Sequence, residues 1–112
     1  MARLSGGRLI SEAKVTDYLL NPAHAVGRSK AAFFERFGFS VDRPVELLEA
    51  LLAHPEANAV VDVAESAYGI KSVVQCRLDT PDGRNPCVRS VWFLETGSRL
   101  QRLVTAYPFQ GG

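Results

Sequence analysis

A few polar side chains in this sequence have the types needed for proton transfer and anion binding. His24 is one of two histidines, and an imidazole that is neutral near pH 7 suits proton transfer. Arg28 and Lys30 follow it closely, and such cations stabilise negative charge on a reacting phosphate. The cluster is therefore a candidate site for phosphodiester chemistry. The alternative is that His24 is a surface-loop histidine without a catalytic role, which is the commoner case for an isolated histidine.

The segment that carries these cations predicts a helix from Gly27 to Phe37, because Ala31 and Phe34 follow helical spacing. Arg28 and Lys30 lie in its first turn, where the helix dipole disfavours positive charge. Their position is explained if the free N–H groups of the turn and the two cations together hold a phosphate. The alternative, in which both side chains point into water, is left open.

Further candidates lie in the second half of the chain, where three segments predict an antiparallel meander between Ser72 and Pro108. The runs SVVQCRL, CVRSVWFL and RLVTAYP are rich in β-branched and aromatic residues, which favour strands. The turn Pro81-Asp82-Gly83-Arg84 carries the Asp-Gly pair typical of a two-residue hairpin loop, and Gly97-Ser98 marks the next connection.

A two-residue loop at Asp82-Gly83 would place Cys76 opposite Arg89 on an apolar sheet face. A charge on such a face needs an ionic partner or a ligand, so Arg89 is a candidate site residue. Arg77 would then lie on the opposite, mixed face and is a second candidate for phosphate binding. The two thiols, Cys76 and Cys87, have no metal-binding spacing and are predicted to be buried and reduced.

Two hydroxyls complete the candidate site. Thr105 and Tyr107 project from the same side of the last strand and can donate hydrogen bonds to a phosphate, although both residue types also favour strands for structural reasons. We therefore predict that His24, Arg89, Thr105 and Tyr107 converge on one cleft beside Lys30.

The remaining pattern sets the fold class. A short helix is predicted over residues 14–20 with Tyr18 turned inward, and another from Asp42-Arg43-Pro44 to Pro55, with His54 capping its C-terminus. Residues 59–64 can add a strand. The order predicts an α+β fold in which N-terminal helices pack on a three- to four-stranded antiparallel meander sheet.

Length and composition restrict the class of protein. With 112 residues, the chain is expected to form a single domain, of which residues 1–12 are a loose N-terminal arm. The net charge is only +1, but it divides into +3 over residues 1–41, −5 over residues 42–70 and +3 over residues 71–112. No apolar run spans a bilayer and no acidic or histidine cluster suits a metal, so we expect a cytoplasmic protein without metal or cofactor.

The whole pattern also resembles a known family. The run DYLLNPAHAVGRSKAAFFERFGF, the PDGR turn, VRSVWF and RLVTAYP are similar to a small uncharacterised bacterial domain family, over nearly all of residues 15–108. That family resembles, more distantly, the barnase–EndoU–colicin–RelE group of ribonucleases, which occur in toxin–antitoxin and polymorphic toxin systems. The resemblance is one of fold and carries no activity by itself.

The resemblance implies a metal-independent endoribonuclease that acts on RNA such as tRNA and has a cognate antitoxin or immunity protein. The residues that would fill its site are His24, Lys30, Arg77 or Arg89, Thr105 and Tyr107. EndoU-type sites use two histidines, and here only His24 is suitably placed. The alternative is a non-catalytic interaction module or immunity-like protein, with an exposed apolar patch around Trp92, Phe93 and Phe109.

Overall fold

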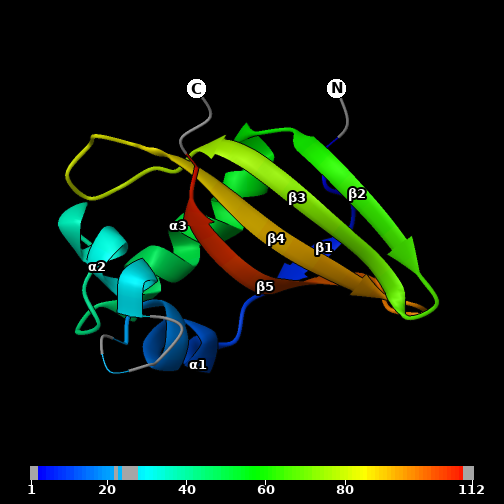
Figure 1. Cartoon of the computed structure of the whole chain (residues 1–112), viewed down its shortest axis with the longest axis horizontal. Helices are drawn as coiled ribbons and strands as arrows, with labels where there is room; N and C mark the ends of the chain where they lie inside the picture. Colours follow the sequence, from blue (N-terminus) through cyan, green and yellow to red (C-terminus); the bar gives the residue numbers. More distant parts are fainter. Residues whose placement is uncertain (1–2, 22, 24–27, 110–112) are drawn as a thin grey trace.

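The computed structural model describes residues 3–21, 23 and 28–109, which form an α+β fold with helices gathered at one end of a strongly twisted sheet (Figure 1). The elements in chain order are β1 (Gly7–Leu9), α1 (Glu12–Lys14), a π-helical turn η1 (Val15–Leu19), α2 (Arg28–Arg36), α3 (Pro44–Ala57), β2 (Val60–Ser66), β3 (Gly69–Arg77), β4 (Cys87–Glu95) and β5 (Leu100–Pro108). The α+β class is confirmed. Helix α3 continues past Pro55, which was expected to end it and lies in its last turns.

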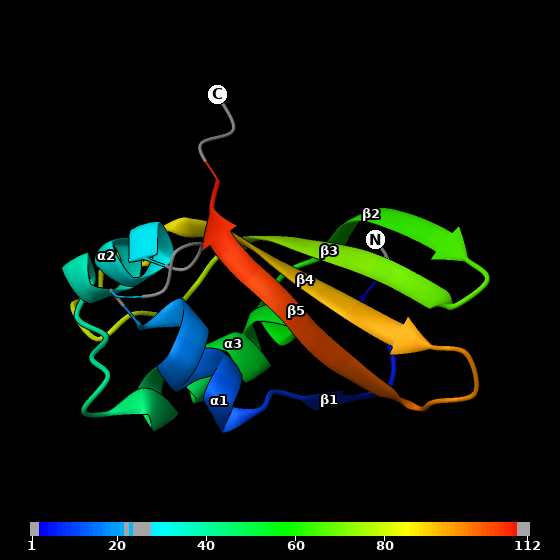
Figure 2. The ribbon, with the colours of Figure 1, turned by 60° about the horizontal axis from the view of Figure 1, so that its bottom comes forward.

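The sheet has five strands in the order β1-β5-β4-β3-β2, and it is mixed, not the three- to four-stranded antiparallel sheet that the sequence predicts. Strands β2 to β5 form an antiparallel meander, while β1 adds to the edge by pairing in parallel with residues 100–102 of β5. Figure 2 shows β1 running beside the start of β5.

Strand β1 lies in the segment expected to be a loose arm, and this expectation is wrong for the described residues. Leu4 and Ile10 on either side of it are buried in the core. The glycines that suggested a loop instead permit close packing: Gly6 has φ +85°, and a Cβ there would lie 2.9 Å from the carbonyl oxygen of Arg99.

The connection between β3 and β4 is longer than a two-residue hairpin. It runs from residue 78 to residue 86, and Thr80 and Asn85 bridge it through two hydrogen bonds of 2.9 and 3.1 Å. Cys76 therefore pairs with Val88 and Gln75 with Arg89, one residue away from the predicted register. Because a shift of one residue exchanges the faces of one strand relative to the other, Arg89 does not lie on the apolar face as predicted.

The core lies between the sheet and the helices. Its sheet side is made of buried residues of β3, β4 and β5, namely Val74, Val88, Trp92, Leu103 and Ala106. Its helix side includes Val15, Leu19, Phe34, Leu47 and Leu51, all fully buried. Trp92 has no exposed surface, so the predicted apolar patch that included it is not an exposed feature of the molecule.

A buried hydrogen-bond chain fastens α3 to the sheet. His54 contacts the carbonyl oxygen of Cys76 through Nε2 at 2.8 Å and the hydroxyl of Ser90 through Nδ1 at 2.7 Å. Trp92 donates its indole N–H to the same hydroxyl at 2.8 Å. A carbonyl can only accept, so Nε2 carries the proton, Nδ1 accepts from Ser90, and Ser90 accepts from Trp92. His54 thus joins α3, β3 and β4. The prediction that it caps the C-terminus of the helix is wrong.

This arrangement predicts a pH-dependent stability. Burial lowers the pKa of His54, and hydrogen bonds to the backbone at Cys76 and Val88 oppose the shift only in part. The folded state favours neutral His54, while the unfolded chain takes up a proton near pH 6.5, so stability is complete above about pH 6.5 and falls below it. Urea unfolding of the wild type across this range should show the fall.

The matched variant is His54→Phe, which should lose about 2–4 kcal/mol at neutral pH because it leaves buried partners of the imidazole unpaired. It should also lose much of the pH dependence below about 6.5. Glu49→Gln, on the exposed side of the same helix, serves as the control and should keep both properties. A His54→Phe protein as stable as wild type would contradict this assignment.

Candidate functional site

The observed register places three of the predicted site residues on the sheet face opposite the main core. Arg89 of β4 pairs with Tyr107 of β5, and Val91 pairs with Thr105. A bulge between Val91 and Trp92 shifts the pairing, so that Leu103 is buried in the core while Thr105 and Tyr107 remain half-buried. Arg89, Thr105 and Tyr107 therefore lie together on two neighbouring strands.

A residue that sequence reasoning assigned to the core joins them. Tyr18 lies in η1, and its hydroxyl is 3.4 Å from Oγ1 of Thr105. The wide turn, in which the N–H of Leu20 bonds to the carbonyl of Val15 at 2.8 Å, buries Val15 and Leu19 while Tyr18 stays half-buried. Ordinary α-helical spacing predicts all three inward, so only the π-helical geometry reveals the position of Tyr18.

Two lysines surround the Tyr18 ring. The ammonium nitrogen of Lys14 lies 5.1 Å from the ring centroid and that of Lys30 lies 5.5 Å from it. Among the residues that the structure describes, neither lysine forms an ion pair with a carboxylate. Their charges are consequently not neutralised by a side-chain anion and can attract one from solution.

The same neighbours act on the Tyr18 hydroxyl. Burial raises its pKa, but hydrogen bonds to Thr105 and Lys30 and the charges of Lys30 and Lys14 outweigh this effect, so the pKa lies below its ordinary value of 10.0. A hydroxyl of this kind gives up its proton more readily than a free tyrosine does. The cluster of Tyr18, Lys14, Lys30 and Thr105 is called the Tyr18 cluster below.

Arg89 extends this surface along β4. Its Nε donates to Oε1 of Gln75 at 2.8 Å, and its guanidinium lies 3.9 Å from the ring centroid of Phe109. The sequence predicts that Arg89 needs a partner. Among the described residues, its partners are these two neutral groups and not a carboxylate. Its hydrogen-bonding capacity is only partly used, because a guanidinium has five N–H donors.

Of the other predicted residues, Arg77 does not join this group. Arg77 lies at the end of β3, is largely exposed and pairs with Asp79 at 3.8 Å. Arg28 begins α2, and its side chain is outside the description. His24 also lies outside the described residues, so its predicted convergence with Thr105 and Tyr107 stays a prediction.

The two cysteines are free, and Cys76 is exposed while Cys87 is half-buried, which corrects the prediction that both are buried. Burial raises the pKa of Cys87 to about 11, and a hydrogen bond to Cys76 contributes in the same direction. Cys87 is thus a protonated thiol at neutral pH and a poor nucleophile. No group of His, Cys, Asp and Glu within the described residues is placed to hold a metal ion.

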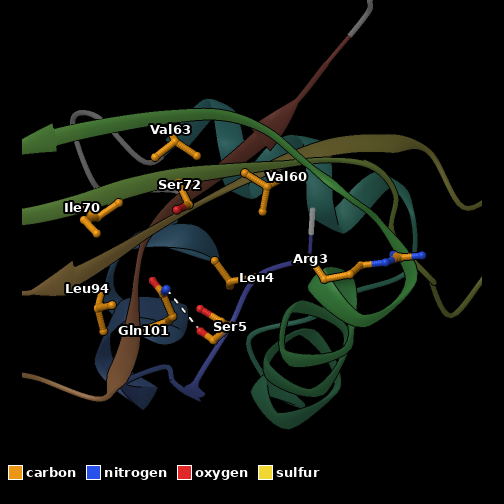
Figure 3. Close-up of a pocket in the computed structure, with 9 residues that line it drawn as sticks. All are labelled: Arg3, Leu4, Ser5, Val60, Val63, Ile70, Ser72, Leu94 and Gln101. Atoms are coloured by element: carbon orange, nitrogen blue, oxygen red, sulfur yellow. Dashed lines mark hydrogen bonds between the residues drawn. The ribbon is translucent and has the colours of Figure 1, made fainter. Parts of the chain in front are cut away.

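A separate pocket of about 180 Å³ lies at the far half of the sheet (Figure 3). Its walls are Arg3, Leu4, Ser5, Val60, Val63, Ile70, Ser72, Leu94 and Gln101. Gln101 donates to the carbonyl oxygen of Ser5 at 3.3 Å, while its own amide oxygen is buried and has no hydrogen-bond partner among the described residues. The pocket has an apolar wall and one free acceptor, a combination that suits recognition and not proton transfer.

A family model described as a domain of unknown function, DUF6883, matches residues 7–110. The chain belongs to the DUF6883 family. This DUF6883 domain has no match among the curated proteins. No helix within its described residues is long and apolar enough to cross a membrane.

The fold of this DUF6883 domain is similar to that of a solved structure. That structure is a chain of a contact-dependent growth inhibition toxin–immunity protein complex from Klebsiella pneumoniae 342, with 22% sequence identity and a TM-score of 0.68. The alignment covers 93% of the present chain and 95% of that chain. At this identity the match concerns the fold, and the two chains share it over almost their whole length.

The site geometry generates a prediction for titration. The ultraviolet absorbance of the folded protein should show one tyrosine that ionises below pH 10, and Tyr18→Phe should remove that step. Lys30→Met should move the step upward, since it removes a hydrogen bond and a positive charge from the phenolate. Arg102→Met, on β5 but beside Phe93, is the matched control. An unchanged titration in Tyr18→Phe would contradict the site.

Proposed function

We propose that this chain is a metal-independent endoribonuclease, the toxin component of a bacterial toxin–immunity system. The Tyr18 cluster carries the proposal, because it gathers two unneutralised cations and two hydroxyls where a phosphate could bind. The fold shared with a chain of a toxin–immunity complex supports a place in such a system. The cytoplasm as the setting and tRNA as the substrate class are parts of the proposal that the cleavage test below addresses.

The proposed reaction needs no metal. A base removes the proton of a ribose 2′-hydroxyl, the oxygen attacks phosphorus, and the bond to the 5′ oxygen breaks to leave a cyclic phosphate. Lys14 and Lys30 stabilise the charge on the pentavalent phosphorus, and Tyr18 donates its proton to the departing 5′ oxygen. His24 is the candidate base, as its residue type indicates.

The remaining residues of the face have supporting roles in this proposal. Thr105 orients the Tyr18 hydroxyl through their 3.4 Å contact. Arg89 and Tyr107 are paired across β4 and β5. Both can donate hydrogen bonds to a neighbouring phosphate of the bound RNA. Arg77, which is engaged with Asp79 beyond them, would contact RNA only as a peripheral cation.

The first test of this function is cleavage of total tRNA by the pure protein in the presence of a chelator. Wild type should release discrete fragments, and Tyr18→Phe should cleave about 10²–10⁴ times more slowly, which is the usual contribution of a positioned acid. RNA binding by the variant should be retained. Tyr68→Phe, at the exposed turn between β2 and β3, is the control and should cleave at the wild-type rate.

The second test concerns binding. Lys30→Ala should weaken RNA binding and reduce the dependence of affinity on salt by about one phosphate contact. Lys71→Ala, an exposed lysine of β3 away from the Tyr18 cluster, should change neither quantity appreciably. If the two variants bind alike at every salt concentration, the phosphate site is not at the Tyr18 cluster.

A second candidate function, a non-catalytic partner-binding or immunity-like module, is favoured by a different surface. Strand β2 forms the edge of the sheet, and Val61 and Val63 on it are about half exposed. An edge strand can pair with an extended segment of another protein, and the pocket in Figure 3 lies beside it. Absence of tRNA cleavage, together with a cognate complex that Val63→Asp disrupts, would favour this function over the first.

A further inference from the structure

A second pocket, with aromatic walls, lies between α2 and the end of β5. Its volume is about 440 Å³, within the range of roughly 300–1,000 Å³ typical of small-molecule sites. The walls are Ser29, Phe33, Arg36, Phe37, Pro86, Cys87, Pro108 and Phe109. It is called the α2–β5 pocket below.

The aromatic rings of this pocket are held in place. Phe33 and Phe37 lie with their ring centroids 5.0 Å apart on one side of α2. The backbone of Phe109, on the opposite wall, is tied to β4 because its N–H donates to the carbonyl oxygen of Cys87 at 3.0 Å, and its ring lies against the guanidinium of Arg89. The pocket is therefore a slot between aromatic groups whose positions are set by a helix and by a strand.

Guanidinium groups lie over two of these rings. Arg84 is 4.4 Å from the centroid of Phe37, and Arg89 is 3.9 Å from that of Phe109. Arg84 is neutralised by Asp82, whereas neither Arg36 nor Arg89 forms an ion pair with a carboxylate in the described part of the chain. The pocket consequently combines flat apolar surfaces with positive charge at its margin.

This pocket adjoins the Tyr18 cluster. Ser29 in its wall precedes Lys30, and Pro108 follows Tyr107. Arg89 lies next to both regions, since it pairs in the sheet with Tyr107, two residues after Thr105 of the Tyr18 cluster, and its guanidinium lies over Phe109. Figure 2 shows α2 beside the C-terminal end of β5, and residues from both segments line the pocket.

We propose that the α2–β5 pocket binds an unpaired nucleobase next to the phosphate held by the Tyr18 cluster, an inference that rests on the proposed ribonuclease function. Unstacked bases of single-stranded RNA bind by stacking on aromatic rings and on guanidinium planes, and both are present here. A purely apolar ligand would not use Arg36 and Arg89, and an isolated anion would not use the phenylalanines. The substrate is therefore single-stranded at the cleavage position.

The experiment compares two short single-stranded 2′-O-methyl RNAs, which cannot be cleaved through the 2′-hydroxyl. One carries 2-aminopurine at its centre and the other is abasic at the same position, so their phosphates are identical. The full chain should bind the first about ten times more tightly and quench its fluorescence by stacking. Phe109→Leu and Phe33→Leu should reduce the difference in affinity to less than about twofold, while thermal unfolding confirms that each variant is folded.

Phe93→Leu is the matched control, because Phe93 also lies near an arginine, Arg102, but outside the pocket. It should keep the tenfold preference. Equal binding of the two RNAs by wild type, or an unchanged preference in both pocket variants, would overturn the base pocket. If Lys30→Ala weakened the binding of either RNA in that case, the phosphate site would still be supported. Failure of the wild type to bind any RNA would overturn both proposals.

Discussion

The structure depends on the buried hydrogen-bond chain through His54. Trp92 donates to Ser90, Ser90 donates to His54, and His54 donates to the carbonyl of Cys76. The first two bonds are buried and the third is partly buried, so the indole, the hydroxyl and the imidazole are all paired inside the domain. These bonds join α3 to β3 and β4 at once. They also require that the strands pair in the observed register, because a slip of one residue would turn Ser90 away from the imidazole and leave it unpaired.

The register in turn determines what the opposite sheet face can do. With Ser90 and Trp92 directed to the core, Arg89 must project from the other side of β4, toward Gln75 and Phe109. A charged residue that would be costly among the core side chains becomes available to a ligand. Strand β4 thus carries the stabilising polar network on one face and the cationic residue of the candidate site on the other.

The sequence was informative wherever a local pattern decided the outcome. β-Branched runs marked β3, β4 and β5, and the apolar spacing of α2 marked that helix. The register was missed because Asp82-Gly83 does form a turn, but within a longer loop whose ends are bridged by Thr80 and Asn85. The contact of Tyr18 with Thr105 was missed for a similar reason, since a π-helical turn leaves Tyr18 half-buried and Thr105 is distant in sequence.

The short length of β1 limits which insertions this domain can accept near its N-terminus. Within the described residues, β1 pairs with β5 at residues 100–102 alone. The later part of that edge has no described strand beside it, and there the Tyr18 hydroxyl of η1 reaches the side chain of Thr105. A longer β1 would occupy that edge with a ladder of its own and exclude the Tyr18 ring. The position at which β1 ends therefore limits how many residues this strand can have. An insertion that lengthened β1 would add backbone hydrogen bonds to β5, but it would remove the contact between Tyr18 and Thr105.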